Sequence, residues 1–119
     1  MSHDLDFAFA VLSQIRNAEE LGHLFEDWLT FREQEELMLR LNIARRLFLG
    51  QTYETIETET GASSTTISRV RRALYRGAGG YRTVFERLAA QGAMPAPRDD
   101  AENLPGAGGG RTAPTSPPR

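Results

Sequence analysis

One predicted helical face of this chain carries side chains that can hold nucleic acid. Residues 63–76 read SSTTISRVRRALYR, and at 100° per residue the hydroxyls and arginines gather opposite the apolar residues. Arginine makes bidentate hydrogen bonds to guanine and to phosphate, and short hydroxyl side chains allow close approach to base edges. No acid interrupts this face, so the pattern predicts contact with DNA. The face comprises Thr65, Ser68, Arg69, Arg72 and Arg76.

The neighbouring residues predict the helix-turn-helix that would position this face. Gly61 suits the sharp turn, because glycine adopts a positive φ without a Cβ clash. We expect Ser63 or Ser64 to cap the second helix with its hydroxyl. The spacing of the apolar residues lets the first helix pack on the second. These apolar residues are Ile56, Ile67, Val70 and Leu74.

The first helix of the predicted motif presents hydroxyls and acids together. Thr52 and Thr55 are expected to approach the phosphate backbone. Three glutamates on the same helix, at positions 54, 57 and 59, would repel phosphate, so either they point away from it or the affinity for DNA is low. The predicted DNA contacts are Thr52, Thr55, Ser63, Ser64, Thr65, Ser68, Arg69, Arg72 and Arg76.

The distribution of charge supports DNA binding, although the formal net charge of the 119 residues is −2. Residues 1–60 carry twelve acids and five arginines, a net of −7. Residues 61–88 carry six arginines and one glutamate, a net of +5, and residues 89–119 carry three of each sign. A basic segment on an acidic body is an electrostatic footprint that the net charge conceals.

Residue types needed for catalysis or metal binding are scarce. The chain has no cysteine, and neither His3 nor His23 has converging partners for a metal or a catalytic base. We therefore expect no enzyme activity, no metal and no cofactor. The first residues lack the basic region of a signal peptide, and no apolar run reaches the roughly 20 residues of a membrane span. These features predict a cytoplasmic protein without a membrane partner.

Two helices are expected at the start of the chain. Asp4 or Asp6 can cap the first, which would run to about Arg16. Its apolar residues cover more than one side, so it must be buried from more than one direction. Asn17 and Glu20 form a capping box that opens the second helix. The apolar residues of the two helices are Leu5, Phe7, Phe9, Val11, Leu12, Ile15, Leu21, Leu24, Phe25, Trp28 and Leu29.

A third helix is expected from a second capping box, formed by Thr30 and Glu33, to Leu49, with Gly50 as its stop signal. Its expected buried positions are Leu37, Leu41, Ala44, Leu47 and Phe48. After the helix-turn-helix and a break at Gly77, Gly79 and Gly80, a last helix is expected to contain the apolar residues Tyr81, Val84, Phe85 and Leu88.

The composition changes at Gly92. All six prolines and five of the eleven glycines lie in residues 92–119, and such a segment cannot bury enough apolar surface to become ordered. The sequence thus predicts an all-α domain at residues 1–91 and a disordered Pro/Gly-rich tail at residues 92–119. Because so small a domain buries only about 60–65% of the surface of its unfolded chain, the apolar excess of its first two helices predicts a homodimer.

Two stretches carry a family resemblance. LTFREQEELMLRLNIARRLFLG followed by QTYETIETETGASSTTISRVRRAL, together with the later GGYRTVFERL, resembles the Trp repressor superfamily, in particular its YerC/YecD-type branch. The resemblance covers about residues 5–90. It implies six helices in an intertwined homodimer, with the helix-turn-helix as the fourth and fifth helices. It also implies repression of transcription through binding of double-stranded operator DNA.

The resemblance further implies a small-molecule effector pocket. Two positions depart from the tryptophan-binding repressor: Val70 replaces a glycine and Asp27 replaces an aliphatic residue, so tryptophan is not expected as the ligand. Arg40 also has a local alternative, since Glu36 lies four residues before it and can pair with it along the helix. The matching pocket positions are Thr30, Arg40, Thr66 and Arg69.

Two other interpretations of the arginine face stay open. The helix can be a solvated member of a small bundle, or its arginines can bind an acidic protein partner. Salt dependence distinguishes DNA from a protein partner, because neutralising phosphates makes log affinity fall linearly and steeply with log salt. The favoured interpretation is a sequence-specific DNA-binding transcriptional regulator that acts as a repressor.

Overall fold

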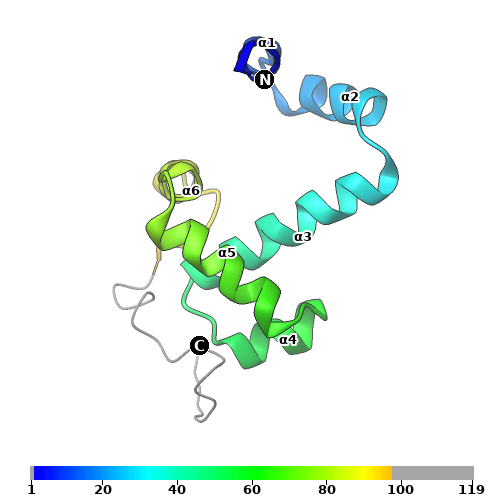
Figure 1. Ribbon diagram of the computed structural model, residues 1–119. Coiled ribbons are helices and arrows are strands. Elements are labelled where there is room, and N and C mark those ends of the chain that lie inside the picture. The colour runs from blue at the N-terminus through cyan, green and yellow to red at the C-terminus, as the bar shows by residue number, and fades with distance from the viewer. Residues whose placement is uncertain (1, 98–119) are drawn as a thin grey trace. The chain divides into compact units, whose positions relative to one another are not determined.

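The computed structural model of the protein describes residues 2–97, and every regular element within them is an α-helix (Figure 1). The predicted all-α, six-helix fold is thereby confirmed. The described residues form two units, one up to Leu37 and one from Met38 onward, and the third helix begins in the first and ends in the second. The helices are α1 (Ser2–Leu12), α2 (Ala18–Trp28), α3 (Phe31–Phe48), α4 (Tyr53–Thr60), α5 (Ser64–Arg76) and α6 (Gly80–Ala90).

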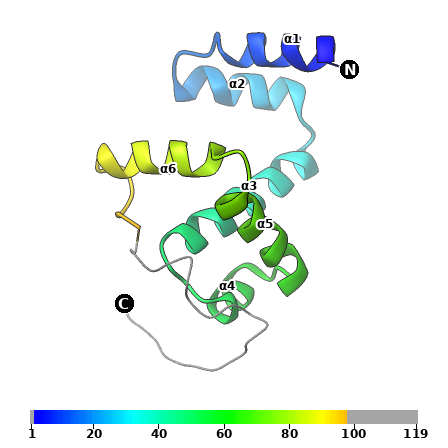
Figure 2. The ribbon, with the colours of Figure 1, turned by 60° about the vertical axis from the view of Figure 1, so that its left-hand side comes forward.

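Helix α1 differs from its prediction at both ends. It begins at Ser2, so Asp4 lies in its first turn instead of capping it, and it ends at Leu12 instead of near Arg16. After Leu12 the chain forms a tighter turn, in which the backbone N–H of Ile15 donates to the Leu12 carbonyl three residues before it. Helix α2 then runs in the reverse direction (Figure 2).

The predicted caps of α2 and α3 are formed. The Asn17 side chain accepts from the backbone N–H of Glu20 at 2.9 Å, while the Glu20 carboxylate accepts from the N–H of Arg16. Thr30 and Glu33 make the complete reciprocal box, with distances of 2.9 and 3.1 Å. These contacts satisfy N–H groups that have no partner within their own helix.

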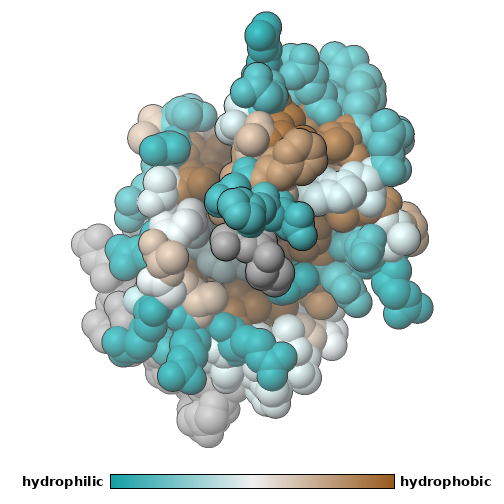
Figure 3. Space-filling view, turned by 45° about the horizontal axis from the view of Figure 1, so that its top comes forward, coloured by the Kyte–Doolittle hydropathy of each residue, from teal (hydrophilic) through white to brown (hydrophobic). Residues whose placement is uncertain are grey.

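The first unit has no buried core of its own. Residues 3–37 are all exposed or half-buried, and the Phe7 ring remains 71% exposed. The space-filling view shows apolar surface left uncovered (Figure 3). The exposed large apolar residues of this unit are Leu5, Phe7, Phe9, Leu21, Trp28 and Phe31.

The second unit contains the buried core. On α3 the buried stripe begins at Ile43, which the sequence did not single out, whereas Leu41 was expected inside and is 51% exposed. That prediction was wrong because the buried part of α3 begins only at Ile43, and Leu41 lies before it although it points to the same side as Phe48, seven residues later. Gly50, with φ 91°, ends α3 in a Schellman motif, as the stop signal predicted. The core comprises Ile43, Ala44, Leu47, Phe48, Tyr53, Ile56, Ile67, Val70, Leu74 and Phe85.

Helix α6 contributes Phe85 to this core, and its ring lies 5.4 Å from that of Phe48, centroid to centroid. Val84, next to Phe85 on the same helix, is exposed. After the left-handed Gly92 the chain turns back, and Met94 packs against the core, although it lies beyond residue 91. The tail from residue 98 lies outside the described residues. Within residues 2–97, no helix is both long and apolar enough to cross a membrane.

Candidate nucleic-acid interface

Helices α4 and α5 form the predicted helix-turn-helix and pack against each other. Gly61 makes the turn with φ 76°, the left-handed conformation that its sequence position predicted. The Thr60 hydroxyl reinforces the turn, because it donates to the Ile56 carbonyl at 2.6 Å and accepts from the Ala62 N–H at 3.1 Å. The turn between the two helices is therefore held by a side chain as well as by the backbone.

One face of α5 is fixed in the core. Ile67, Val70 and Leu74 are at most 4% exposed, in agreement with the predicted packing. The phenol of Tyr75 also donates to the backbone carbonyl of Leu47, at the end of α3. A helix held by three buried aliphatic side chains and a hydrogen bond keeps its outer face in a fixed orientation.

The outer face of α5 carries only hydroxyls and arginines among its polar groups. Within residues 2–97, neither Arg69 nor Arg72 takes part in an ion pair or a side-chain hydrogen bond. Arg71 differs from them, since it is half-buried and its guanidinium lies 5.4 Å from the centre of the Tyr75 ring. The exposed residues on the outer face are Ser64, Thr65, Ser68, Arg69, Arg72 and Arg76.

Two of the predicted DNA contacts serve as helix caps. The Thr52 hydroxyl accepts from the backbone N–H of Thr55, and the Ser63 hydroxyl accepts from that of Thr66, each at 3.2 Å. In each pair the two hydroxyls also lie 3.1 Å apart. The first turn of α5 contains no acid, so the positive end of its helix dipole is not offset by a carboxylate there.

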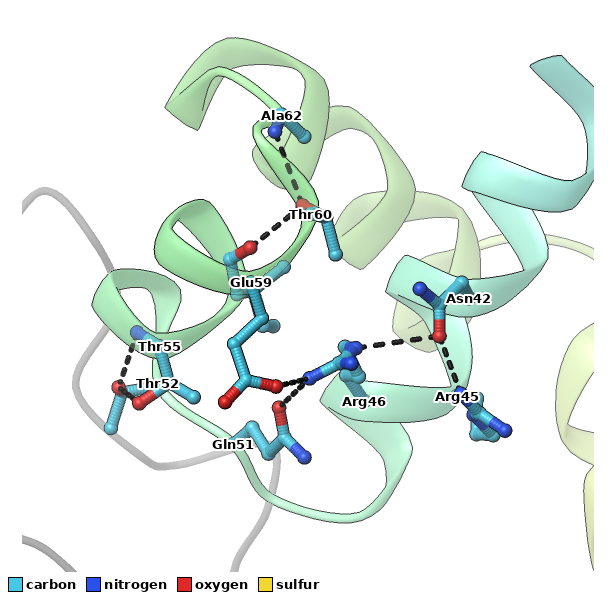
Figure 4. A network of polar contacts seen from close by, with 10 residues as sticks. Asn42, Arg45, Arg46, Gln51, Thr52, Thr55, Glu59, Thr60 and Ala62 are labelled. Atoms are coloured by element: carbon cyan, nitrogen blue, oxygen red, sulfur yellow. Dashed lines mark hydrogen bonds and ion pairs between the residues drawn. The ribbon is translucent and has the colours of Figure 1, made fainter. Parts of the chain in front are cut away.

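The acids of α4 have three different environments. Glu59 turns toward α3 and pairs with Arg46, while Glu57 is half-buried and Glu54 is exposed (Figure 4). A shallow hollow on α4 is lined by Glu54, Glu59 and two threonines, Thr55 and Thr58. Glu59 has a cationic partner in Arg46, and both Glu54 and Glu59 lie in the hollow beside Thr55, so the expectation that the acids point away from phosphate stays a prediction.

Contacts made by Arg46, Thr60 and Tyr75 were not expected from the sequence. Each of these side chains supports the helix-turn-helix from behind, and Arg46 and Tyr75 do so across 13 and 28 positions of chain. Contacts between residues so far apart in the chain cannot be predicted from a regular spacing in the sequence. A threonine just before the turn glycine was the one available local signal, because threonine can bond to the carbonyl four residues back.

The four predicted effector positions are distributed over both units and differ in burial. Thr30 belongs to the first unit and uses its hydroxyl to cap α3, whereas the other three positions belong to the second unit. Arg40 is exposed and, among the described residues, makes no ion pair with Glu36, which the helical spacing had favoured. Thr66 is half-buried and Arg69 is exposed.

The two positions that depart from the tryptophan-binding pattern also differ in burial. Val70 is buried, 4% exposed, and belongs to the core, whereas Asp27 is exposed on α2. The Val70 side chain is thus part of the packing that holds α5 and not of an open surface.

This chain is similar to known proteins along most of the six helices. An uncharacterised protein of Bacillus subtilis strain 168, YerC, is 42% identical over 85 residues, which cover 71% of this chain and 82% of YerC. A crystal structure of a Staphylococcus aureus protein, provisionally named a Trp repressor, matches with a TM-score of 0.67 at 40% identity, over 72% of this chain and 86% of that one. A TrpR-like protein of Eubacterium eligens matches with a TM-score of 0.68 at 38% identity, over 73% and 90% of the two chains.

The family model for the Trp repressor protein matches residues 3–89. This range takes in all but the ends of the six helices, including the whole helix-turn-helix. Together with its six-helix fold and its similarity to YerC, the match shows that this chain belongs to the Trp repressor family of DNA-binding regulators.

Proposed function

We propose that this protein is a sequence-specific transcriptional repressor that reads the major groove of its operator with α5. One observation carries the proposal: α5 is fixed in the core along one face and exposes the unpaired guanidinium groups of Arg69 and Arg72 on the other. Such groups can make bidentate hydrogen bonds to guanine or phosphate without first breaking an internal ion pair. The proposed DNA contacts are Thr52, Thr55, Ser63, Ser64, Thr65, Ser68, Arg69, Arg72 and Arg76.

The two ends of the motif have different proposed roles. The short side chains at the start of α5 allow its N-terminal turn to approach base edges, and its uncompensated helix dipole favours a nearby phosphate. On α4, the Thr52 hydroxyl caps the helix, and the Thr55 hydroxyl is the one placed to donate to a phosphate oxygen. The capping residues position the backbone, and the arginines supply sequence discrimination.

We infer that the working form is a homodimer. The first unit leaves Phe7, Phe9 and Trp28 more than half exposed, and the second unit does the same with Met38 and Leu41. Apolar surfaces of this extent on a small domain mark an interaction site. A second copy of the chain would supply apolar partners for the exposed surfaces of both units. The dimer would also present two α5 helices to major grooves one turn apart, about 34 Å along the DNA.

We also propose that DNA binding needs no tryptophan. Val70 is already packed inside the core, so the helix does not depend on a bound indole for support at this position. An effector that binds at Thr30, Arg40, Thr66 and Arg69 would have to do so with Val70 packed in the core.

The test starts with enrichment of bound sequences from a randomised library of double-stranded DNA. Binding of the enriched duplex is then measured by fluorescence anisotropy for the wild type, for Arg72→Ala and for Arg87→Ala, which removes an exposed arginine of α6. Arg72→Ala should weaken specific binding by about 1–3 kcal/mol if it reads a base, and Arg87→Ala should not.

Repeating the titrations at several salt concentrations separates the alternatives. If Arg72 holds only phosphate, its removal lowers the salt slope by about one and weakens all sequences equally. Unchanged affinity in the Arg72 variant would remove α5 as the reading helix. Failure to enrich any DNA would favour an acidic protein partner for the arginine face.

A further inference from the structure

We infer that Arg46 is a positioning residue for DNA binding, which neutralises Glu59 and holds it against α3 so that α4 can approach phosphate. The inference rests on the proposed DNA-binding function and adds a residue outside the helix-turn-helix to it. Its basis is a network of polar contacts that joins three successive segments of the chain (Figure 4).

The Arg46 guanidinium binds three acceptors. Its Nε donates to Asn42 Oδ1 at 3.3 Å, one turn back on α3. Its Nη1 donates to Gln51 Oε1 at 2.9 Å, in the connection to α4, and to Glu59 Oε1 at 2.5 Å, near the end of α4. One side chain therefore ties together the end of α3, the connection after it and the far end of α4.

The helix dipole disfavours the charge of one member of the pair and favours that of the other. Glu59 lies near the C-terminus of α4, where the helix dipole already places negative charge, and the last turn of α4 contains no basic residue. Arg46 lies in the last turn of α3, where a cation is favoured. The Arg46 side chain is 18% exposed and that of Glu59 is 53% exposed, so the pair is partly shielded from water.

The position of Glu59 matters for DNA because it lines the same shallow hollow as Thr55. A phosphate bound by the Thr55 hydroxyl would lie near the Glu59 carboxylate, and two negative charges at such a distance repel each other. Arg46 removes this repulsion without itself being on the proposed DNA face. Glu54, which lines the hollow as well, has no such partner among the described residues.

The experiment uses the full chain and the fluorescent duplex enriched by the wild type. The variants are Arg46→Met, Glu59→Gln and the two combined. Arg45→Met serves as the matched control, because it removes the neighbouring arginine and leaves Glu59 paired; within residues 2–97 the Arg45 guanidinium bonds only to the neutral Asn42 side chain.

We expect Arg46→Met to weaken DNA binding by about three- to tenfold at low salt, because it leaves the negative charge of Glu59 unpaired beside the phosphates. Adding Glu59→Gln should restore the affinity to within about twofold of the wild type, since no charge is then left to mask. Arg45→Met should stay within about twofold of the wild type. The defect of Arg46→Met should shrink as salt rises, because screening weakens charge repulsion but does not repair a misplaced helix.

Two results would overturn the inference: wild-type affinity in Arg46→Met, or a double variant as weak as Arg46→Met alone. If Arg46→Met fails to fold, Glu59→Gln decides alone, since it should bind DNA at least as tightly as the wild type and a weaker affinity would contradict the inference. These outcomes are distinct from failure of the proposed function, in which the wild type itself enriches no DNA.

Discussion

The phenol hydroxyl of Tyr75 on α5 donates a hydrogen bond to the backbone carbonyl of Leu47 at the end of α3, across 3.3 Å. The same ring lies beneath the guanidinium of Arg71. The inner side of α5 is therefore held by polar as well as apolar contacts. This arrangement explains how a small domain keeps the arginines on the outer side of α5 in a fixed orientation.

Tyr75→Phe should lower the free energy of unfolding by about 0.5–1.5 kcal/mol, because the ring remains but its hydrogen bond to the Leu47 carbonyl is lost, and that carbonyl keeps only the Gly50 N–H as a donor among residues 2–97. Urea titration followed by circular dichroism measures the change. Tyr81→Phe is the matched control, since within residues 2–97 the Tyr81 hydroxyl makes no hydrogen bond. Equal losses in both variants would mean that the hydrogen bond adds no stability.

Ile67→Ala should destabilise the fold by about 2–5 kcal/mol, because the side chain is fully buried and its removal leaves a cavity in the core. Ser68→Ala, on the exposed face of the same helix, should change stability by no more than about 0.5 kcal/mol. Thermal melts of the two proteins provide the comparison, and a small effect of Ile67→Ala would contradict the packing of α4 on α5.

Gly77→Ala should destabilise the end of α5. A Cβ at this position would lie 2.4 Å from the Ala73 carbonyl oxygen, so the backbone must move, at a cost of about 1–3 kcal/mol. Gly80→Ala is the control, since its Cβ would meet no atom within 4 Å and alanine favours the helix. Chemical denaturation of both variants tests the difference, and an unaffected Gly77→Ala would show that the turn is free to relax.

Sedimentation of residues 1–97 at micromolar concentration should show two chains, because the apolar surface of the first unit needs a partner. The fragment keeps Met94, which packs on the core, and should melt within a few degrees of the full chain. The variant Phe7→Glu should shift the fragment toward single chains, because a buried charge opposes association. A well-folded monomer at this concentration would disprove the homodimer.

Isothermal calorimetry with free tryptophan should show no micromolar binding. Val70 fills space where the tryptophan-binding pattern requires a glycine, and overfilling a packed site costs about 1–3 kcal/mol. Operator binding should accordingly be the same with and without tryptophan. A micromolar dissociation constant for tryptophan, together with tighter DNA binding in its presence, would show that the core opens at Val70.

Most of the helices and their ends follow from the sequence, because their causes are local. Asn17, Thr30 and Ser63 each cap the helix that follows, and Gly61 and Gly50 take the left-handed conformation at a turn and a helix end. Each of these residues acts on backbone groups only a few positions away, so its role can be recognised in the sequence alone. The apolar spacing likewise identified Ile67, Val70 and Leu74 as the inner face of α5.

The tertiary structure alone decided which long-range partners meet. Helical periodicity gives the angle between side chains on one helix but not which part of the helix a neighbour covers, so Leu41 was expected inside and Ile43 was not. Similarly, Arg46 finds Glu59 and Tyr75 finds Leu47 only after the helices have packed. The sequence by itself determined six helices and the arginine face of α5, and the packing of α3 against the motif decided what holds that face in place.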